Sequence, residues 1–263
     1  MIHPPHHLPA WLGLAGSLAA AVLASIYIAA AKFSARRFGK WPHRRTASWI
    51  AGIACLAAAA ASPLMERAHH DFAAHMLVHL LLGMLAPLLM ALAAPVTLLF
   101  RTIDPKMARR VSRLLRSPLS KALARPETAA LLNIGGLWAL YAAGLYAATQ
   151  MNTALHILVH MHMFLAGYLF TATLVYVDAI PHRFSFTYRC VVCIAALAGH
   201  AILAKYIYAH PPAGVPGTQA KTGALLMYYG GDAVDGALVF VMFRQWYMSR
   251  RKGREALRTV SGT

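Results

Sequence analysis

The sequence predicts an all-α membrane protein, a bundle of seven transmembrane helices. Of its 263 residues, 59% are apolar and only 13% are charged, whereas roughly 25% of the residues in an ordinary soluble domain are charged. Seven apolar runs approach the ~20 residues that a helix needs to cross a hydrocarbon core of about 30 Å. We expect these runs to form a single transmembrane domain, over residues 11–31, 48–65, 72–100, 128–149, 155–177, 189–209 and 224–247.

The basic residues are distributed unevenly over the connections between these runs. The formal net charge is +17, yet 22 of the 25 Lys and Arg residues fall on one side of the membrane if successive runs alternate in direction. Cytoplasmic connections carry such an excess in membrane proteins. The distribution predicts an outer N-terminus, a cytoplasmic C-terminus and contact with anionic membrane lipid, with no nucleic acid partner.

The first two runs are expected to serve helix packing, because both are rich in small residues that allow close helix contacts. The first run should be retained in the protein, since the N-terminus lacks the basic segment of a cleavable signal peptide. His3, His6 and His7 precede it. A short histidine-rich tract of this kind can bind a metal loosely or simply remain solvated.

The third run begins with two histidines in an otherwise apolar stretch. His75 and His79 are four residues apart and therefore share one face of a helix. Ionisable groups at membrane depth are costly and usually face a bundle interior or a polar cavity. The preceding connection carries His69 and His70, either as part of a polar loop or as an external metal-capture point that feeds His75.

An amphipathic helix is predicted within residues 101–125, between the third and fourth runs. Met107 and Leu114 recur at helical spacing opposite a row of arginines, as in helices that lie on a membrane surface. We expect this helix to anchor the protein at the cytoplasmic face without carrying chemistry. On either side of this helix, two further expectations concern the neighbouring runs. Pro87 and Pro95 are expected to kink the third run. The fourth run carries no strong metal ligand.

The fifth run begins with a second histidine pair. His156 and His160 share one helix face, whereas His162 lies about 200° round the helix from His160. The third and fifth runs both start at the outer face, so the two pairs are expected at matching depth. Two independent His-x-x-x-His pairs at one depth are the strongest indication of function in the chain.

The last two runs add further candidate ligands. The sixth carries Cys190 and Cys193 near its cytoplasmic end and His200 in its outer half. The two cysteines could bind a soft metal or pack as small side chains, and no disulfide is predicted. Asp232 and Asp235 share one face of the seventh run, where an unpaired carboxylate would be costly unless it is protonated, paired or bound to a metal.

These residues predict a metal site or a proton-handling site in the outer half of the bundle. Imidazole suits copper, zinc, iron and nickel, and thioether ligands shift the choice toward Cu(I). Methionines flank both histidine pairs. The candidate ligands and their supporting residues are His75, His79, His156, His160, His200, Asp232 and Asp235. Alternatively, each histidine hydrogen-bonds a carbonyl or an aspartate and serves helix packing.

Several segments of the chain resemble one known family. Residues 75–82, 86–89, 156–167, 178–183 and 228–232 are similar to the motifs of the multi-spanning cytochrome c oxidase assembly factor CtaG of the Bacillus type. The resemblance extends over most of the chain from the second run onward. A single-span copper chaperone shares the CtaG name, and this chain does not resemble it.

The resemblance implies a non-catalytic assembly factor for haem-copper oxidase in the bacterial plasma membrane. It implies copper, as Cu(I), as the bound metal, and cytochrome c oxidase subunits and periplasmic copper donors as partners. A homo-oligomer is compatible with this function. The histidine motif of the family maps onto His75, His79, His156 and His160, with His162 as a further position, and its Gly-Gly-Asp motif maps onto residues 230–232.

Two other classes of function are alternatives. A haem-binding membrane protein could use His79 and His160 as axial ligands. A proton-coupled transporter could use Asp232 and Asp235 as a relay, although no pair of broken helices in inverted-repeat positions is visible. An enzyme is not expected, because no motif supplies an activated nucleophile.

Overall fold

The computed structural model describes residues 10–60, 62–178 and 183–261, and all regular structure in these ranges is helical. Five helices are long and apolar enough to cross a membrane, and two bent helix pairs raise the number to seven if each pair is one span. The prediction of an all-α, multi-pass membrane protein is therefore confirmed, with five to seven candidate spans.

The helices follow one another along the chain without any intervening strand in the described ranges. They are α1 (Ala10–Phe38), α2 (His43–Ala60), α3 (Ser62–His70), α4 (Phe72–His79), α5 (Ala86–Leu92), α6 (Pro95–Thr102), α7 (Pro105–Leu115), α8 (Pro118–Leu123), α9 (Pro126–Ala130), α10 (Gly136–Tyr141), α11 (Leu145–Met151), α12 (Thr153–Leu174), α13 (Phe186–Ala209) and α14 (Gly217–Ser261), with π-helical segments η1 (Leu80–Leu85) and η2 (Leu131–Gly135).

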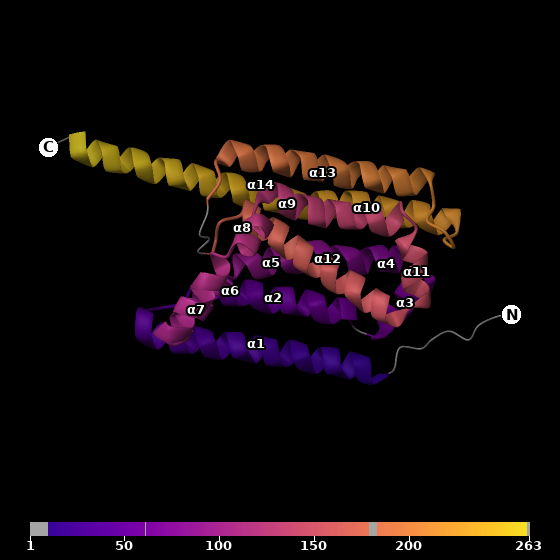
Figure 1. The fold of residues 1–263 in the computed structure, drawn as a ribbon, viewed down its shortest axis with the longest axis horizontal. Coiled ribbons are helices and arrows are strands. Elements are labelled where there is room, and N and C mark those ends of the chain that lie inside the picture. The colour runs from indigo at the N-terminus through magenta and orange to yellow at the C-terminus, as the bar shows by residue number, and fades with distance from the viewer. Residues whose placement is uncertain (1–9, 61, 179–182, 262–263) are drawn as a thin grey trace.

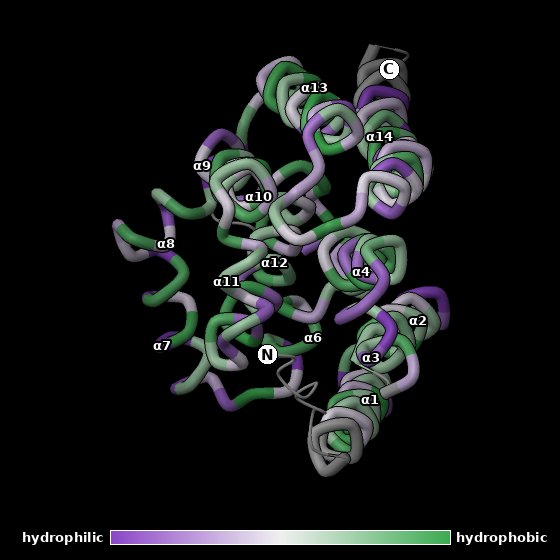
Figure 2. Tube along the Cα trace, turned by 90° about the vertical axis from the view of Figure 1, so that its right-hand side faces the viewer, coloured by the Kyte–Doolittle hydropathy of each residue, from purple (hydrophilic) through white to green (hydrophobic). Residues whose placement is uncertain are grey.

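The long helices lie side by side in one bundle (Figure 1). Viewed along the bundle, α12 and α4 lie near its middle, α1 lies at one edge beside α2, and α13 and α14 form the opposite edge (Figure 2). We call the end that contains α3, α11 and the start of α12 the histidine end, because His69 and His156 lie there. The opposite end, with α7 and the last turns of α14, is called the basic end (Figure 1).

The third predicted run is one helical path only as far as Leu92. Asp71 caps its start by accepting a hydrogen bond from the Ala73 backbone nitrogen at 2.8 Å. The path widens into the π-helix η1 just before Pro87, which cannot donate a hydrogen bond to the preceding turn. Ala94 then adopts a left-handed φ of 56°, and α6 begins at Pro95. The predicted range 72–100 is therefore corrected to a span that ends at Leu92 and a separate α6.

Other boundaries also differ from the predicted ranges. The second predicted run is bent by 53° between α2 and α3, and the fourth by 73° between α10 and α11. Gly144, with a φ of 80°, provides the turn in the fourth. The seventh predicted run, 224–247, lies within a 45-residue helix, α14. Its last turns are rich in residues that favour a helix, namely Arg, Lys, Glu, Ala and Leu. A search for apolar runs does not detect such a charged continuation.

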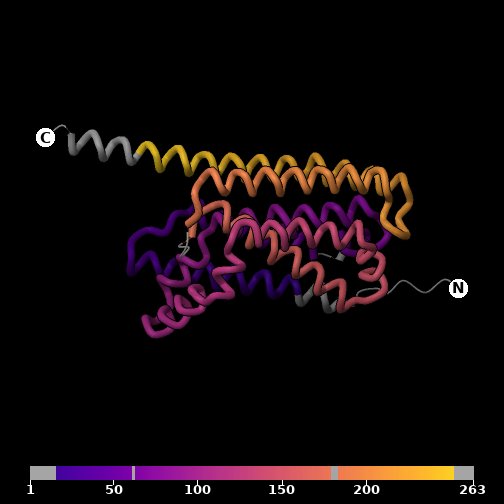
Figure 3. The backbone as a smooth tube through the Cα atoms, turned by 45° about the horizontal axis from the view of Figure 1, so that its top comes forward, coloured from indigo at the N-terminus to yellow at the C-terminus, as the bar shows by residue number. Residues whose placement is uncertain are grey.

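The predicted amphipathic segment is helical, as α7. Its apolar side chains Met107 and Leu114 are both exposed, and Figure 3 shows α7 and α8 standing off the long helices toward the basic end. The predicted helix is confirmed, and its position on the cytoplasmic membrane surface stays a prediction.

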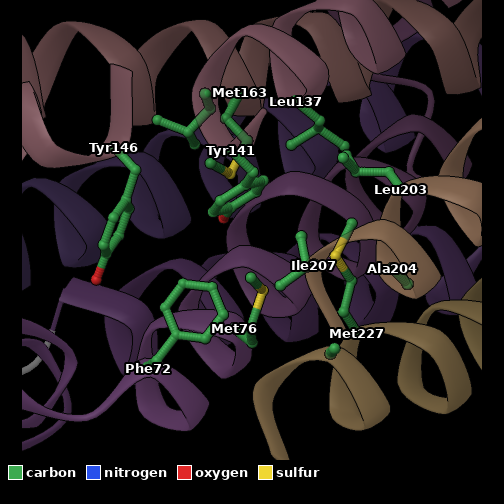
Figure 4. Packing of buried hydrophobic residues seen from close by; sticks show 12 residues of the cluster. Phe72, Met76, Leu137, Tyr141, Tyr146, Met163, Leu203, Ala204, Ile207 and Met227 are labelled. Carbon is green, nitrogen blue, oxygen red and sulfur yellow. The ribbon is translucent and has the colours of Figure 1, made fainter. Parts of the chain in front are cut away.

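The centre of the bundle is closely packed around α4, α10, α12, α13 and α14. Figure 4 shows Tyr141, Tyr146 and Met163 projecting toward Phe72 and Met76 on α4. A short distance away, α12 crosses η1 so closely that a methyl group on Gly167 would overlap the carbonyl oxygen of Gly83. Glycine at position 167 thus allows α12 to approach η1, which directly follows His79.

Candidate metal site

The two predicted histidine pairs lie together in the interior of the bundle. The exposed fractions of His75, His79, His156 and His160 are 2%, 1%, 6% and 9%. The ring centroids of His156 and His160 are 4.1 Å apart, and those of His160 and His75 are 5.9 Å apart. Side chains from α4 and α12 therefore meet in the interior of the bundle and join the two pairs into one cluster.

His75 is held by aromatic side chains from α4 and from the bent α10–α11 pair. Its Nε2 atom lies 3.1 Å from the Tyr141 hydroxyl oxygen. Its ring stacks on Phe72 at 5.9 Å and meets Tyr146 edge-on at 4.9 Å. The 73° bend that separates α10 from α11 lets both tyrosines reach the same imidazole.

His160 has a defined tautomer. Its Nδ1 atom lies 2.8 Å from the backbone oxygen of His156, and a carbonyl oxygen only accepts hydrogen bonds. Nδ1 therefore donates, and Nε2 keeps the lone pair that a metal ligand needs.

A second group of side chains surrounds His79. Its Nδ1 atom lies 3.1 Å from the Sδ atom of Met163, and its ring stacks on that of His200 at 6.0 Å. His200 packs against α14, where a methyl group on Gly231 would lie 2.5 Å from its Cε1 atom. Tyr141 links the two groups, because its ring centroid is 6.0 Å from that of His75 and 6.4 Å from that of His79.

A small cavity of about 30 Å³ lies beside this second group. Its polar lining includes His79, Asn133, Thr171, His200 and Asp235. A space of this size holds one or two waters or a bare cation. Asp235 is buried and lines the cavity, which makes it the predicted aspartate that shares this space with His79 and His200.

Two predicted ligands are exposed side chains. His162 is exposed on α12, and its Nε2 atom donates to the backbone oxygen of Leu132 in η2 at 3.1 Å. Asp232 is exposed on α14, so it does not form a buried carboxylate pair with Asp235. His162 therefore lies away from the buried imidazoles, whereas Asp232 is exposed but directly follows Gly231, which packs against His200.

The remaining candidates have different surroundings. Cys193 packs among Leu174, Ala196 and Leu238, and both it and Cys190 are free thiols. His69 lies against the cluster, with its ring 5.2 Å from that of His156. His3, His6 and His7 lie outside the described residues.

Two contributors were not among the predicted site residues. Tyr141 lies in a run without strong metal ligands, and only its position within an apolar run marks it in the sequence. Gln150 contacts His69 from the last turn of α11. Both contacts depend on the bend of the fourth run, which the apolar pattern does not reveal.

The imidazole nitrogens of the cluster are ligand atoms that suit a soft cation. Among the described residues, His79 Nε2, His200 Nε2 and both ring nitrogens of His156 are buried without a hydrogen-bond partner. Each such atom costs about 1–3 kcal/mol, and a bound cation would remove that cost at each lone-pair nitrogen it contacts, which for His156 is one of its two ring nitrogens. The rings meet in pairs, and within the described ranges no group of three or more His, Cys, Asp or Glu side chains is arranged to hold a metal ion.

Apolar helices of membrane-spanning length around a cluster of buried imidazoles define a multi-pass membrane protein with a histidine-rich core. The chain belongs to the cytochrome c oxidase caa3 assembly factor family, whose model matches residues 25–249. The family therefore covers every helix that contributes to the cluster.

Mycobacterial proteins are among the relatives of the chain. Two uncharacterized proteins, from Mycobacterium bovis and Mycobacterium tuberculosis, are each 30% identical to it over 190 residues. An uncharacterized protein of Mycobacterium leprae is 27% identical over 191 residues. Each match covers 70% of this chain and 29% of the relative, so the chain corresponds to less than a third of the length of these curated relatives. No solved structure matches the chain.

Proposed function

We propose that this protein binds Cu(I) in the buried histidine cluster and helps to deliver it to cytochrome c oxidase during assembly of the oxidase. The observation that carries the proposal is the set of buried imidazole nitrogens that lack hydrogen-bond partners among the described residues, beside the sulfur atom of Met163. Copper is the cargo of the protein in this proposal, and no catalytic step is assigned to the chain.

The donor types favour Cu(I) over harder cations. Imidazole and thioether groups are soft enough to select Cu(I), whereas carboxylate and water ligands suit magnesium, calcium and manganese. The cluster supplies imidazoles from α4, α12 and α13 and one thioether from α12. The pairwise spacing of the rings suits a cargo that must later be released, because the donors do not enclose a cation on all sides.

The distribution of charge supports an orientation for delivery. The arginine-rich α7 and the end of α14 lie at the basic end (Figure 1), and basic segments remain in the cytoplasm. In the bacterial plasma membrane the histidine end would then face the periplasm. Copper would arrive from donors on that side, and oxidase subunits in the same membrane would receive it.

Metal content after loading with Cu(I) tests the proposal. We would compare the wild-type protein with a His75→Ala/His79→Ala double variant by mass spectrometry. His162→Ala is the matched control, because it also removes an imidazole from the bundle, at a position away from the cluster. Near-stoichiometric copper in the wild type and in His162→Ala, with loss in the double variant, is the expected result.

Two outcomes would refute the proposal. Copper absent from the wild type, or bound equally by the double variant, would return the histidines to a packing or proton-handling role. Because the double variant could unfold, its thermal unfolding is measured in parallel, and His79→Gln provides a smaller change that keeps a polar side chain at the same position.

A further inference from the structure

We infer that His69 is the residue through which copper reaches the buried cluster from the histidine end. This inference rests on the proposed copper function. It assigns a role to a side chain on α3 that lies outside both His-x-x-x-His pairs.

A pocket at the histidine end gives access to His69. It has a volume of about 270 Å³ and is lined in part by His69, His70, Tyr146, Gln150 and Gln219. One water needs about 10–15 Å³ of such space, so the pocket has room for a cation together with bound waters. A cation could therefore reach the edge of the His69 ring before any helix moves, and rotation of that side chain would present its buried Nε2 atom.

His69 is held with one nitrogen ready to act as a ligand. Its Nδ1 atom lies 3.4 Å from the Oε1 atom of Gln150, and because an amide oxygen only accepts, Nδ1 carries the hydrogen. The lone pair is thus on Nε2, which is buried and has no hydrogen-bond partner among the described residues. A contact between the second nitrogen of a histidine and an acceptor is the usual way in which a metal ligand is oriented.

From His69 a series of imidazole rings leads inward. The ring centroids are 5.2 Å apart from His69 to His156, 4.1 Å from His156 to His160 and 5.9 Å from His160 to His75. Each ring contacts the next, so a cation could pass between neighbouring ligands without crossing an apolar gap. Passage through bare hydrocarbon would be far more costly, because an ion loses its solvation there.

His70 provides a natural comparison. It follows His69 in the chain, lines the same pocket and is exposed. If any histidine at the pocket could capture copper, the two positions would be equivalent. If transfer requires the ring contact with His156, only His69 can serve.

The test is the rate of copper transfer from the Cu(I) complex of bicinchoninate, followed by the loss of its colour in a stopped-flow instrument. Wild type, His69→Ala and His70→Ala are compared in detergent, with the final copper content measured for each. We expect His69→Ala to load at least about tenfold more slowly, the scale on which groups that support a metal site change its metal binding. Its final copper content and the behaviour of His70→Ala should match the wild type.

Release of copper provides a second readout. A residue on the route, but outside the final site, changes loading and release by the same factor and leaves the affinity unchanged. Release into excess chelator should therefore slow in His69→Ala as much as loading does. His69→Gln, which keeps a polar side chain, is included in case the alanine variant folds poorly.

The outcomes separate this inference from the proposed function. If the wild type takes up no copper, the proposed function fails. If His69→Ala loads at the wild-type rate, or if it loses copper content along with the rate, His69 is not the access residue, although the copper function still stands.

Discussion

The Nδ1 atom of His79 lies 3.1 Å from the Sδ atom of Met163. This contact joins α4 to α12 and places a thioether sulfur beside a buried imidazole. Met163 is seven residues from His156, so both lie on the face of α12 that is turned toward α4.

Replacement of Met163 should change metal preference more than fold. Met163→Leu keeps the volume and apolar character, so the free energy of unfolding should change by less than about 1.5 kcal/mol. Cu(I) affinity, measured by competition with bicinchoninate, should fall by about tenfold or more, whereas Zn²⁺ affinity should change little. Met161→Leu, at an exposed position on the same helix, is the control. Equal Cu(I) affinity in both variants would rule out the sulfur as a ligand.

Gly167→Ala should destabilise the bundle. The added methyl group would overlap the Gly83 carbonyl oxygen, and overpacking of this kind costs about 1–3 kcal/mol. A methyl group on Gly236, also in a helix, would meet no described atom within 4 Å, so Gly236→Ala should be neutral or stabilising by up to about 1 kcal/mol. Thermal unfolding in detergent measures both. Unchanged stability in Gly167→Ala would contradict the close approach of α12 and η1.

Tyr141→Phe should lower the unfolding temperature of the protein only when copper is absent. The change removes the hydroxyl group beside His75 Nε2 and leaves a buried nitrogen without a partner, at a cost of about 1–3 kcal/mol. A cation bound to that nitrogen would remove the cost, so the unfolding temperatures of wild type and variant should converge when copper is added. A constant difference with and without copper would show that His75 Nε2 does not bind the metal.

Asp178→Ala should destabilise the first turn of α6. The Asp178 carboxylate accepts hydrogen bonds from the Val96 nitrogen at 3.2 Å and from the nitrogen and hydroxyl of Thr97, each at 2.6 Å. Loss of a capping side chain typically costs about 1 kcal/mol. Hydrogen exchange at α6 should rise while copper binding at the distant cluster stays unchanged. Reduced copper binding would instead link the two ends of the bundle.

Sequence patterns predicted the helical membrane class and the two histidine pairs, because apolar length and the spacing of four residues are both local properties. The offset of about 200° between His160 and His162 on a helix predicted that His162 faces elsewhere, which the structure confirms, but the pattern did not predict that Asp232 would be exposed. The rotation of a helix in a bundle depends on its neighbours, and an apolar helix such as α12 gives little periodic signal to define its inward face.

The contribution of Tyr141 was also not predictable from the local pattern. It reaches His75 because the fourth span bends at Gly144, and a glycine inside an apolar run does not by itself indicate a bend of 73°. The length of α14 was underestimated for the opposite reason. Charged residues end an apolar run but continue a helix.

The 45 residues of α14 form a rod on the order of 70 Å long, well beyond the thickness of a bilayer of about 40–45 Å with its headgroups. One end of this helix extends past the bundle (Figure 1). Further along it, the backbone at Gly231 lies so close to His200 that a methyl group there would be 2.5 Å from the Cε1 atom of the imidazole. A side chain larger than hydrogen at position 231 would therefore displace either α14 or the His200 imidazole, so the register of this long helix is tied to a residue of the cluster.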